Sequence, residues 1–174
     1  MATRIPTTVV TGFLGAGKTS LIRHLVENNN GKRLAFLINE FGDLGVDREL
    51  LLGCGVEGCD EDDVVELANG CICCTVADDF IPTMEQLLAR DPQPDHIVIE
   101  TSGLALPQPL IRAFNWPGIS TKVTVDGVVT VVDGRAVHDG QFAHNVAAVD
   151  AQRAEDENLD HETPLSELFE DQIA

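Results

Sequence analysis

The sequence predicts an α/β fold with a mostly parallel sheet and helices on both faces, and three observations support this. The run of consecutive apolar residues Leu34–Ile38 is typical of a strand covered on both faces, and Asp95–Glu100 is a second apolar run, which ends in a carboxylate. A glycine-rich loop joins an earlier apolar run, Thr8–Val10, to a segment with helical spacing, Thr19–Val26. The chain has 174 residues, a length expected for one domain with a substantial core.

The glycine-rich loop carries the first chemical motif, Gly12-Phe13-Leu14-Gly15-Ala16-Gly17-Lys18-Thr19, a complete phosphate loop. Its glycines let backbone N–H groups approach a polyphosphate, Lys18 is expected to reach the outer phosphates, and the Thr19 hydroxyl is expected to ligate Mg²⁺. The following helix then points its positive end at the phosphates. The sequence thus predicts a P-loop NTPase. The nucleotide-binding residues predicted in this segment are Gly12, Gly15, Ala16, Gly17, Lys18, Thr19 and Ser20.

Composition restricts the kind of partner. With 29 acidic against 11 basic residues the formal net charge is -18, which argues against nucleic acid or an anionic membrane as a ligand. The N-terminal residues lack the apolar core of a signal peptide, and no apolar stretch approaches the roughly 20 residues that span a bilayer. We therefore expect a cytoplasmic protein whose five cysteines are reduced thiols.

Carboxylates follow two of the predicted strands. The strand Leu34–Ile38 continues into a glycine-rich acidic loop with Glu40 and Asp43, and the strand Asp95–Glu100 ends in a carboxylate followed by Thr101-Ser102-Gly103. Ligands of open α/β sheets bind at the carboxyl ends of strands. We expect Glu100 to hold Mg²⁺ and the Gly103 N–H to meet a γ-phosphate, with Glu40 or Asp43 orienting the attacking water. The alternatives are a solvated acidic loop and a surface charge at a strand end.

The second chemical motif is the cluster Gly70-Cys71-Ile72-Cys73-Cys74, which follows a short predicted strand, Val64–Leu67. Three thiolates so close in sequence can converge on one ion such as Zn²⁺ or Co²⁺, with a fourth ligand from elsewhere, for which Glu40 is a candidate. Adjacent cysteines form a relaxed disulfide poorly, which favours metal over redox chemistry. The alternative is a set of buried structural cysteines. Cys54 and Cys59 are more simply explained as incidental thiols of a surface insertion.

The middle of the chain is expected to alternate helices and strands. Helices are predicted at 76–90 and Gln108–Phe114, and Trp116 is expected to pack against the core. Two β-rich segments, Lys122–Asp126 and Val128–Val132, flank a glycine, and the second is apolar enough for a central strand. The predicted buried face of the first helix comprises Phe80, Ile81, Met84, Leu87 and Leu88.

The last third carries weaker signals. His138 and His144 are expected to be solvated or satisfied within the fold, rather than ligands, and the acidic segment Ala151–Thr163 is expected to be mobile. The final segment, 164–174, is predicted to be an amphipathic helix. Its apolar stripe comprises Leu165, Leu168, Phe169 and Ile173.

Taken in order, the phosphate loop, Asn39-Glu40-Phe41-Gly42, the cysteine cluster and Glu100-Thr101-Ser102-Gly103-Leu104-Ala105 resemble the CobW family of P-loop GTPases. That family is related to the nickel-insertion GTPases of hydrogenase and urease. The run 66–80 is most similar to the branch linked to cobalamin biosynthesis. The resemblance covers the whole chain and implies a metallochaperone. Such a protein binds Mg²⁺ and GTP, acquires a divalent metal at Cys71, Cys73 and Cys74, and releases it on hydrolysis to a metal-acceptor protein such as a cobalt chelatase.

The chain departs from that family in one respect. It contains no Asn-Lys-x-Asp, the motif that reads guanine in this family, so the preference for GTP over ATP rests on the resemblance. We expect residues 1–174 to be a G domain that is incomplete at its C-terminal end. Thiolates favour Zn²⁺, whereas the branch resemblance favours Co²⁺. Two alternatives from other classes are a metal sensor or buffer with little hydrolysis, and a small-molecule or nucleotide kinase.

Overall fold

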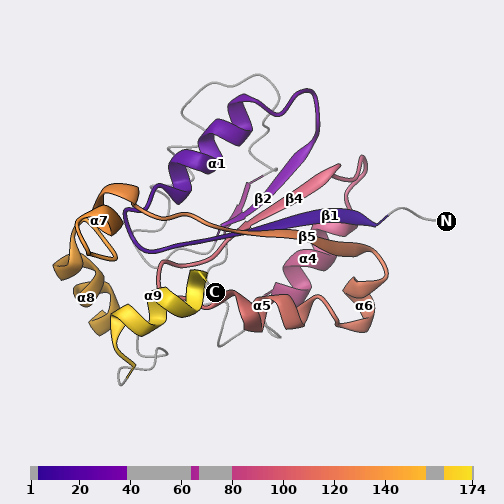
Figure 1. Cartoon of the computed structure of the whole chain (residues 1–174). Coiled ribbons are helices and arrows are strands. Elements are labelled where there is room, and N and C mark those ends of the chain that lie inside the picture. The colour runs from indigo at the N-terminus through magenta and orange to yellow at the C-terminus, as the bar shows by residue number, and fades with distance from the viewer. Residues whose placement is uncertain (1–3, 39–63, 67–79, 156–162, 174) are drawn as a thin grey trace.

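The computed structural model describes residues 4–38, 64–66, 80–155 and 163–173 (Figure 1). Its five strands form one sheet in the order β3-β2-β4-β1-β5, and every adjacent pair is parallel, so the predicted α/β fold with a parallel sheet is confirmed. The strands are β1 (Ile5–Thr11), β2 (Leu34–Ile38), β3 (Val64–Glu66), β4 (His96–Glu100) and β5 (Val123–Thr130). The helices described are α1 (Lys18–Glu27), α4 (Ile81–Leu88), α5 (Pro107–Ala113), α6 (Pro117–Ser120), α7 (Gly134–His138), α8 (Val146–Glu155) and α9 (Leu165–Ile173).

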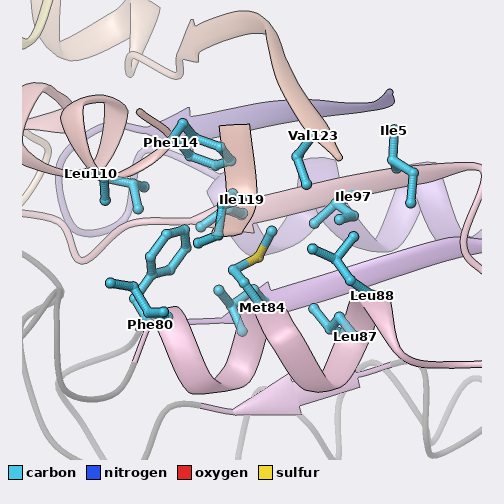
Figure 2. Packing of buried hydrophobic residues seen from close by; sticks show 14 of the residues in the cluster. Ile5, Phe80, Met84, Leu87, Leu88, Ile97, Leu110, Phe114, Ile119 and Val123 are labelled. Atoms are coloured by element: carbon cyan, nitrogen blue, oxygen red, sulfur yellow. The ribbon is translucent and has the colours of Figure 1, made fainter. Parts of the chain in front are cut away.

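One face of the sheet packs against α4, α5 and α6. Figure 2 shows Met84, Leu87 and Leu88 of α4 pointing toward Ile97 of β4 and Val123 of β5, together with Ile119 of α6. The face that α4 buries is the predicted one, because Phe80, Ile81, Met84, Leu87 and Leu88 are all buried. Burying an aliphatic or phenyl side chain contributes about 1.5–3 kcal/mol relative to leaving it in water, so this cluster is a main source of stability.

The opposite face packs against α1. Side chains of a strand alternate between the two faces, so Ala35 and Leu37 of β2 join the α4 cluster, whereas Phe36 and Ile38 pack with Ile22 of α1. The helices therefore cover both faces of the sheet, as predicted, and the continuous apolar run of β2 is explained by burial on both sides.

A third group of helices lies beyond the end of the sheet where β1 leads into α1. There α7, α8 and α9 gather beside the loop that joins β1 to α1 (Figure 1). Their contact with that loop is apolar: Phe13 packs in one buried cluster with Ala143, Val149 and Leu165. Asp133 caps α7, since its side chain accepts hydrogen bonds from the N–H groups of the first turn of that helix.

Two predictions about β structure are wrong. The segments predicted at Lys122–Asp126 and Val128–Val132 form one strand, β5, because the register with β1 shifts between Thr7 and Thr8 and so absorbs Asp126 without breaking the strand. This strand is also not central. Among the strands that the structure describes it lies at the edge of the sheet, where Val128 and Val129 are each 42% exposed.

Three further expectations need correction. Trp116 does not pack into the core, since it is 52% exposed where α5 gives way to α6. The acidic segment predicted from Ala151 onward begins as the last turns of α8, which runs to Glu155. In α9 the stripe is displaced, because Ile173 is exposed and Gln172 is buried. The helix predicted at 76–90 is described from Ile81 to Leu88, and its first predicted residues, 76–79, lie outside the described part.

The histidine expectation agrees with the structure, since His138 at the end of α7 and His144 after it are both exposed. No helix in the described part of the chain is long and apolar enough to cross a membrane.

Candidate functional site

The phosphate loop leaves the end of β1 and turns sharply into α1. Gly12 has φ +135°, a backbone conformation that side chains rarely adopt, and a Cβ placed on it would overlap the backbone carbonyl oxygen of Val131. Gly15 and Gly17 also have positive φ. Gly12 is therefore required both by its φ and by the close approach of the chain that follows β5, whereas Gly15 and Gly17 are favoured by their positive φ.

Within the loop, backbone and side-chain donors converge on one carbonyl. The oxygen of Phe13 accepts hydrogen bonds from the N–H of Ala16 at 3.1 Å and from Nζ of Lys18 at 3.3 Å. Lys18 is 8% exposed, so its ammonium group is held inside the loop rather than in solvent. Helix α1 starts at Lys18, after Gly17, and the N–H groups of its first turn, which include those of Thr19 and Ser20, make no intrahelical bonds. The arrangement presents positive charge and N–H donors to an anion.

Glu100 lies directly beside the phosphate loop. The pairing of β1 with β4 sets Glu100 opposite Val10, two residues before the loop begins, and the N–H of Thr101 donates to the carbonyl of Val10 at 2.9 Å. The carboxylate side chain is only 2% exposed. The structure therefore places a buried carboxylate at the edge of the sheet from which the phosphate loop leaves.

Gly103 touches the phosphate loop itself. A Cβ added to Gly103 would lie 2.7 Å from the backbone nitrogen of Leu14 and 3.3 Å from the carbonyl carbon of Phe13. No real side chain tolerates such a distance to backbone, so this position requires glycine. The loop after β4 and the loop after β1 are thus in direct backbone contact, and Glu100 and Gly103 lie beside the residues predicted to hold phosphates.

The remaining predicted site residues, Glu40, Asp43, Cys71, Cys73 and Cys74, lie outside the described residues, as do Cys54 and Cys59. β2 ends at Ile38, opposite Glu100 of β4, so the chain enters segment 39–63 from the same edge of the sheet as the phosphate loop. Among the residues that the structure describes, no three His, Cys, Asp or Glu side chains gather as a metal site.

Comparison with known proteins identifies the family. A family model described as "CobW/HypB/UreG, nucleotide-binding domain" matches residues 6–174. The chain belongs to the CobW/HypB/UreG family. It is 69% identical over 170 residues to a zinc chaperone CobW of a Sinorhizobium species, an alignment that covers 98% of this chain and 48% of the relative. It is 57% identical over 175 residues to a zinc chaperone CobW of Pseudomonas aeruginosa, covering 98% of this chain and 46% of that one.

The fold of this CobW/HypB/UreG domain is also found in a solved relative. A crystal structure of a zinc-bound triple mutant of the YjiA GTPase aligns with a TM-score of 0.54 and 29% identity, over 79% of this chain and 43% of that one. The P-loop NTPase fold predicted from the sequence is confirmed. The present chain spans about half the length of the relatives it matches.

Two features of this CobW/HypB/UreG domain were not predicted from the sequence. The ring of Phe13 meets those of Phe142 and Phe169 edge-on, each at 5.5 Å between centroids, which fixes the phosphate loop against α9. Gln172 of α9 is buried, and its Nε2 donates to the carbonyl oxygens of Gly103 at 3.2 Å and Ala105 at 3.1 Å. The only sequence signal was a polar residue beside the apolar stripe of a predicted helix.

A half-open groove of about 390 Å³ lies on the α1 face, and no residue of the phosphate loop lines it. Apolar side chains of α1, β1 and β4 line much of it, and His96 joins Thr8 there through a 2.8 Å hydrogen bond between Nε2 and Oγ1. Burial and the nearby Lys32 lower the pKa of His96, against the opposing effect of Asp126.

Proposed function

We propose that this chain binds GTP with Mg²⁺ at the phosphate loop, and that the protein to which it belongs is a GTP-dependent metallochaperone. The observation that carries the nucleotide part is the contact between Gly103 and the phosphate loop backbone, because it brings the loop after β4 to where a terminal phosphate would lie. Family membership supports nucleotide binding, and the names of the relatives, zinc chaperone CobW and YjiA GTPase, support zinc and GTP.

The donor set fits Mg²⁺, an ion that prefers oxygen ligands and usually takes one or two from the protein. Thr19 offers a hydroxyl at the start of α1, and Glu100 offers a buried carboxylate on the adjacent strand. When bound, Mg²⁺ neutralises charge that develops on the phosphate oxygens. The ammonium group of Lys18, held inside the loop, stabilises the same charge, and the Gly103 N–H donates to the γ-phosphate. We assign Glu40 or Asp43 to the orientation of the attacking water.

The metal part of the proposal rests on the chemistry of the cysteine cluster. Cys71, Cys73 and Cys74, with Glu40 as an additional ligand, bind one divalent ion as cargo. We propose Zn²⁺, since thiolates bind it well and the relatives are named for it, with Co²⁺ and a role in cobalamin biosynthesis as the second candidate. A metal-acceptor protein receives the ion, and we assign the coupling between GTP hydrolysis and metal release to segment 39–47.

Nucleotide binding is tested by calorimetric titration of the chain with GTP, GDP and ATP in the presence of Mg²⁺. We expect Lys18→Ala to weaken GTP binding by roughly tenfold to a hundredfold, since it removes a buried cation from the phosphates. Lys122→Ala, at an exposed lysine before β5, is the matched control. Equal GTP affinity in the two variants would refute the assignment of the phosphate loop.

Metal loading is tested by titration with Co²⁺, followed through thiolate-to-metal absorption, and by competition with Zn²⁺. We expect an absorption band that strengthens with Mg²⁺ and GTP, is lost in Cys73→Ala, and persists in the matched control Cys59→Ala. The nucleotide effect should disappear in Lys18→Ala. If the absorption band of the wild-type chain were the same with and without nucleotide, the proposed coupling between nucleotide and metal binding would be wrong. Nucleotide-gated binding without hydrolysis in the full-length protein would instead identify a metal sensor.

A further inference from the structure

Helix α9 carries one polar side chain into the interior, and that side chain reaches the candidate site. Gln172 is 4% exposed. Its amide nitrogen donates to the carbonyl oxygens of Gly103 and Ala105, and its own backbone carbonyl accepts a 2.8 Å hydrogen bond from Oγ1 of Thr130 at the end of β5. One residue of α9 therefore ties the loop after β4 to the last residue of β5.

The orientation of the Gln172 amide is fixed by chemistry. Both of its partners are carbonyl oxygens, which only accept hydrogen bonds, so the NH₂ group and not Oε1 must face them. The amide oxygen, Oε1, is buried and has no hydrogen-bond partner among the residues described. An orphaned buried acceptor is unfavourable, and an apolar residue here would pack without it. The presence of glutamine thus favours a role for its two N–H donors.

Those donors hold the carbonyl groups of Gly103 and Ala105, the residues on either side of Leu104. The loop closes on itself through a 3.1 Å hydrogen bond from the N–H of Ala105 to the carbonyl of Ser102. Within this turn Gly103 has the greatest backbone freedom, because it lacks a Cβ. A hydrogen bond to its carbonyl restricts rotation about its backbone bonds, and so restricts the direction of its N–H, the group to which the proposed function assigns the γ-phosphate.

The same helix holds the other side of the site. Phe169 lies three residues before Gln172, so the two side chains project from the same face of α9. The Phe169 ring packs edge-on against Phe13 of the phosphate loop, at 5.5 Å between centroids. The loop that would bind the β-phosphate and the glycine that would meet the γ-phosphate are therefore held in one frame by two residues of one helix.

We propose that Gln172 is a positioning residue that aligns the Gly103 N–H with the γ-phosphate and so favours a nucleoside triphosphate over a diphosphate. This inference rests on the proposed function. A diphosphate does not reach Gly103, so loss of the amide should weaken triphosphate binding selectively. If Gln172 merely stabilised α9, its replacement would weaken the binding of triphosphate and diphosphate equally.

The test compares the affinities of the whole chain for Mg²⁺-GTPγS and Mg²⁺-GDP by calorimetry. Gln172→Met keeps the length and packing of the side chain and removes both donors. We expect its affinity for GTPγS to fall about fivefold to tenfold, the effect of losing one to two hydrogen bonds, while GDP affinity stays within twofold. Gln86→Met, at an exposed glutamine of α4, is the matched control and should leave both affinities unchanged.

The outcomes separate the two proposals. Equal losses for GTPγS and GDP, or no loss for either, would overturn the role of Gln172 while leaving nucleotide binding intact. A wild-type chain that binds neither nucleotide would refute the proposed function itself, and this inference with it. Should Gln172→Met fail to fold, Gln172→Asn decides the question, because it keeps a buried amide but draws it back from both carbonyls. The same selective loss is then expected, and equal losses would refute the proposal.

Discussion

The ring of Phe13 is expected to make a large contribution to stability for a residue of a ligand-binding loop. It is 1% exposed and packs edge-on against both Phe142 and Phe169. Replacement of a buried phenylalanine by alanine costs about 3–5 kcal/mol, since burial is lost and a cavity remains. Domains of this size have a total stability of about 5–15 kcal/mol, so Phe13→Ala should lose about a fifth of it or more.

The measurement is urea unfolding without nucleotide, with stability changes taken from midpoints at equal m-values. Ile173→Ala, at a half-exposed residue of α9, is the control and should change stability by less than about 0.5 kcal/mol. A loss below about 1 kcal/mol for Phe13→Ala would contradict the packing described here.

A double-mutant cycle isolates the contact between loop and helix. Phe13→Leu and Phe169→Leu each keep apolar volume and remove a ring. If the edge-on pair stabilises the fold beyond its buried area, the two changes should show a coupling energy of about 0.5–1.5 kcal/mol. Additive effects would mean that α9 and the phosphate loop share only nonspecific apolar contact.

Three smaller effects are expected. Burial lowers the pKa of His96, so the unfolded chain takes up a proton at higher pH than the folded one; stability should fall as pH drops from about 7 to about 5, and less so in His96→Gln. The hydrogen bond and charge of Arg33 lower the pKa of Asp95 to about 2. The stabilisation that the ionised Asp95 gives to the fold should persist above about pH 4 and disappear toward pH 2. In Asp95→Asn the unfolding midpoint should lose this part of its dependence on pH. Trp116→Ala should change the unfolding free energy by less than about 0.5 kcal/mol, and a larger loss would contradict its exposure.

The parts of the fold that could be predicted are those where a local pattern has one structural meaning. β2 was predicted with its observed bounds, because five consecutive apolar residues between polar segments fit a strand buried on both faces. The phosphate loop was equally predictable. Its glycines are needed for the positive φ of the loop, which is a local property of the backbone. The chemistry of Lys18 and Thr19 follows from that geometry.

The parts that could not be predicted depend on contacts distant in sequence. Asp126 and Gly127 have the composition of a turn, yet pairing with β1 carries β5 through them by a register shift. Trp116 is exposed because no element covers the junction between α5 and α6 within the described structure. The burial of Gln172 depends on carbonyls nearly seventy residues earlier in the chain, which no helical periodicity can reveal.

The order of the strands bears on how the protein forms during synthesis. β1 leads into the phosphate loop, and the strands on either side of it, β4 and β5, are both made later in the chain than β1. Until Thr130 has emerged, the apolar residues of β1 lack these neighbours, and pairing across so long a separation is slow. Nucleotide can stabilise the fold only after that point, and until then the apolar side chains of β1 remain exposed to aggregation.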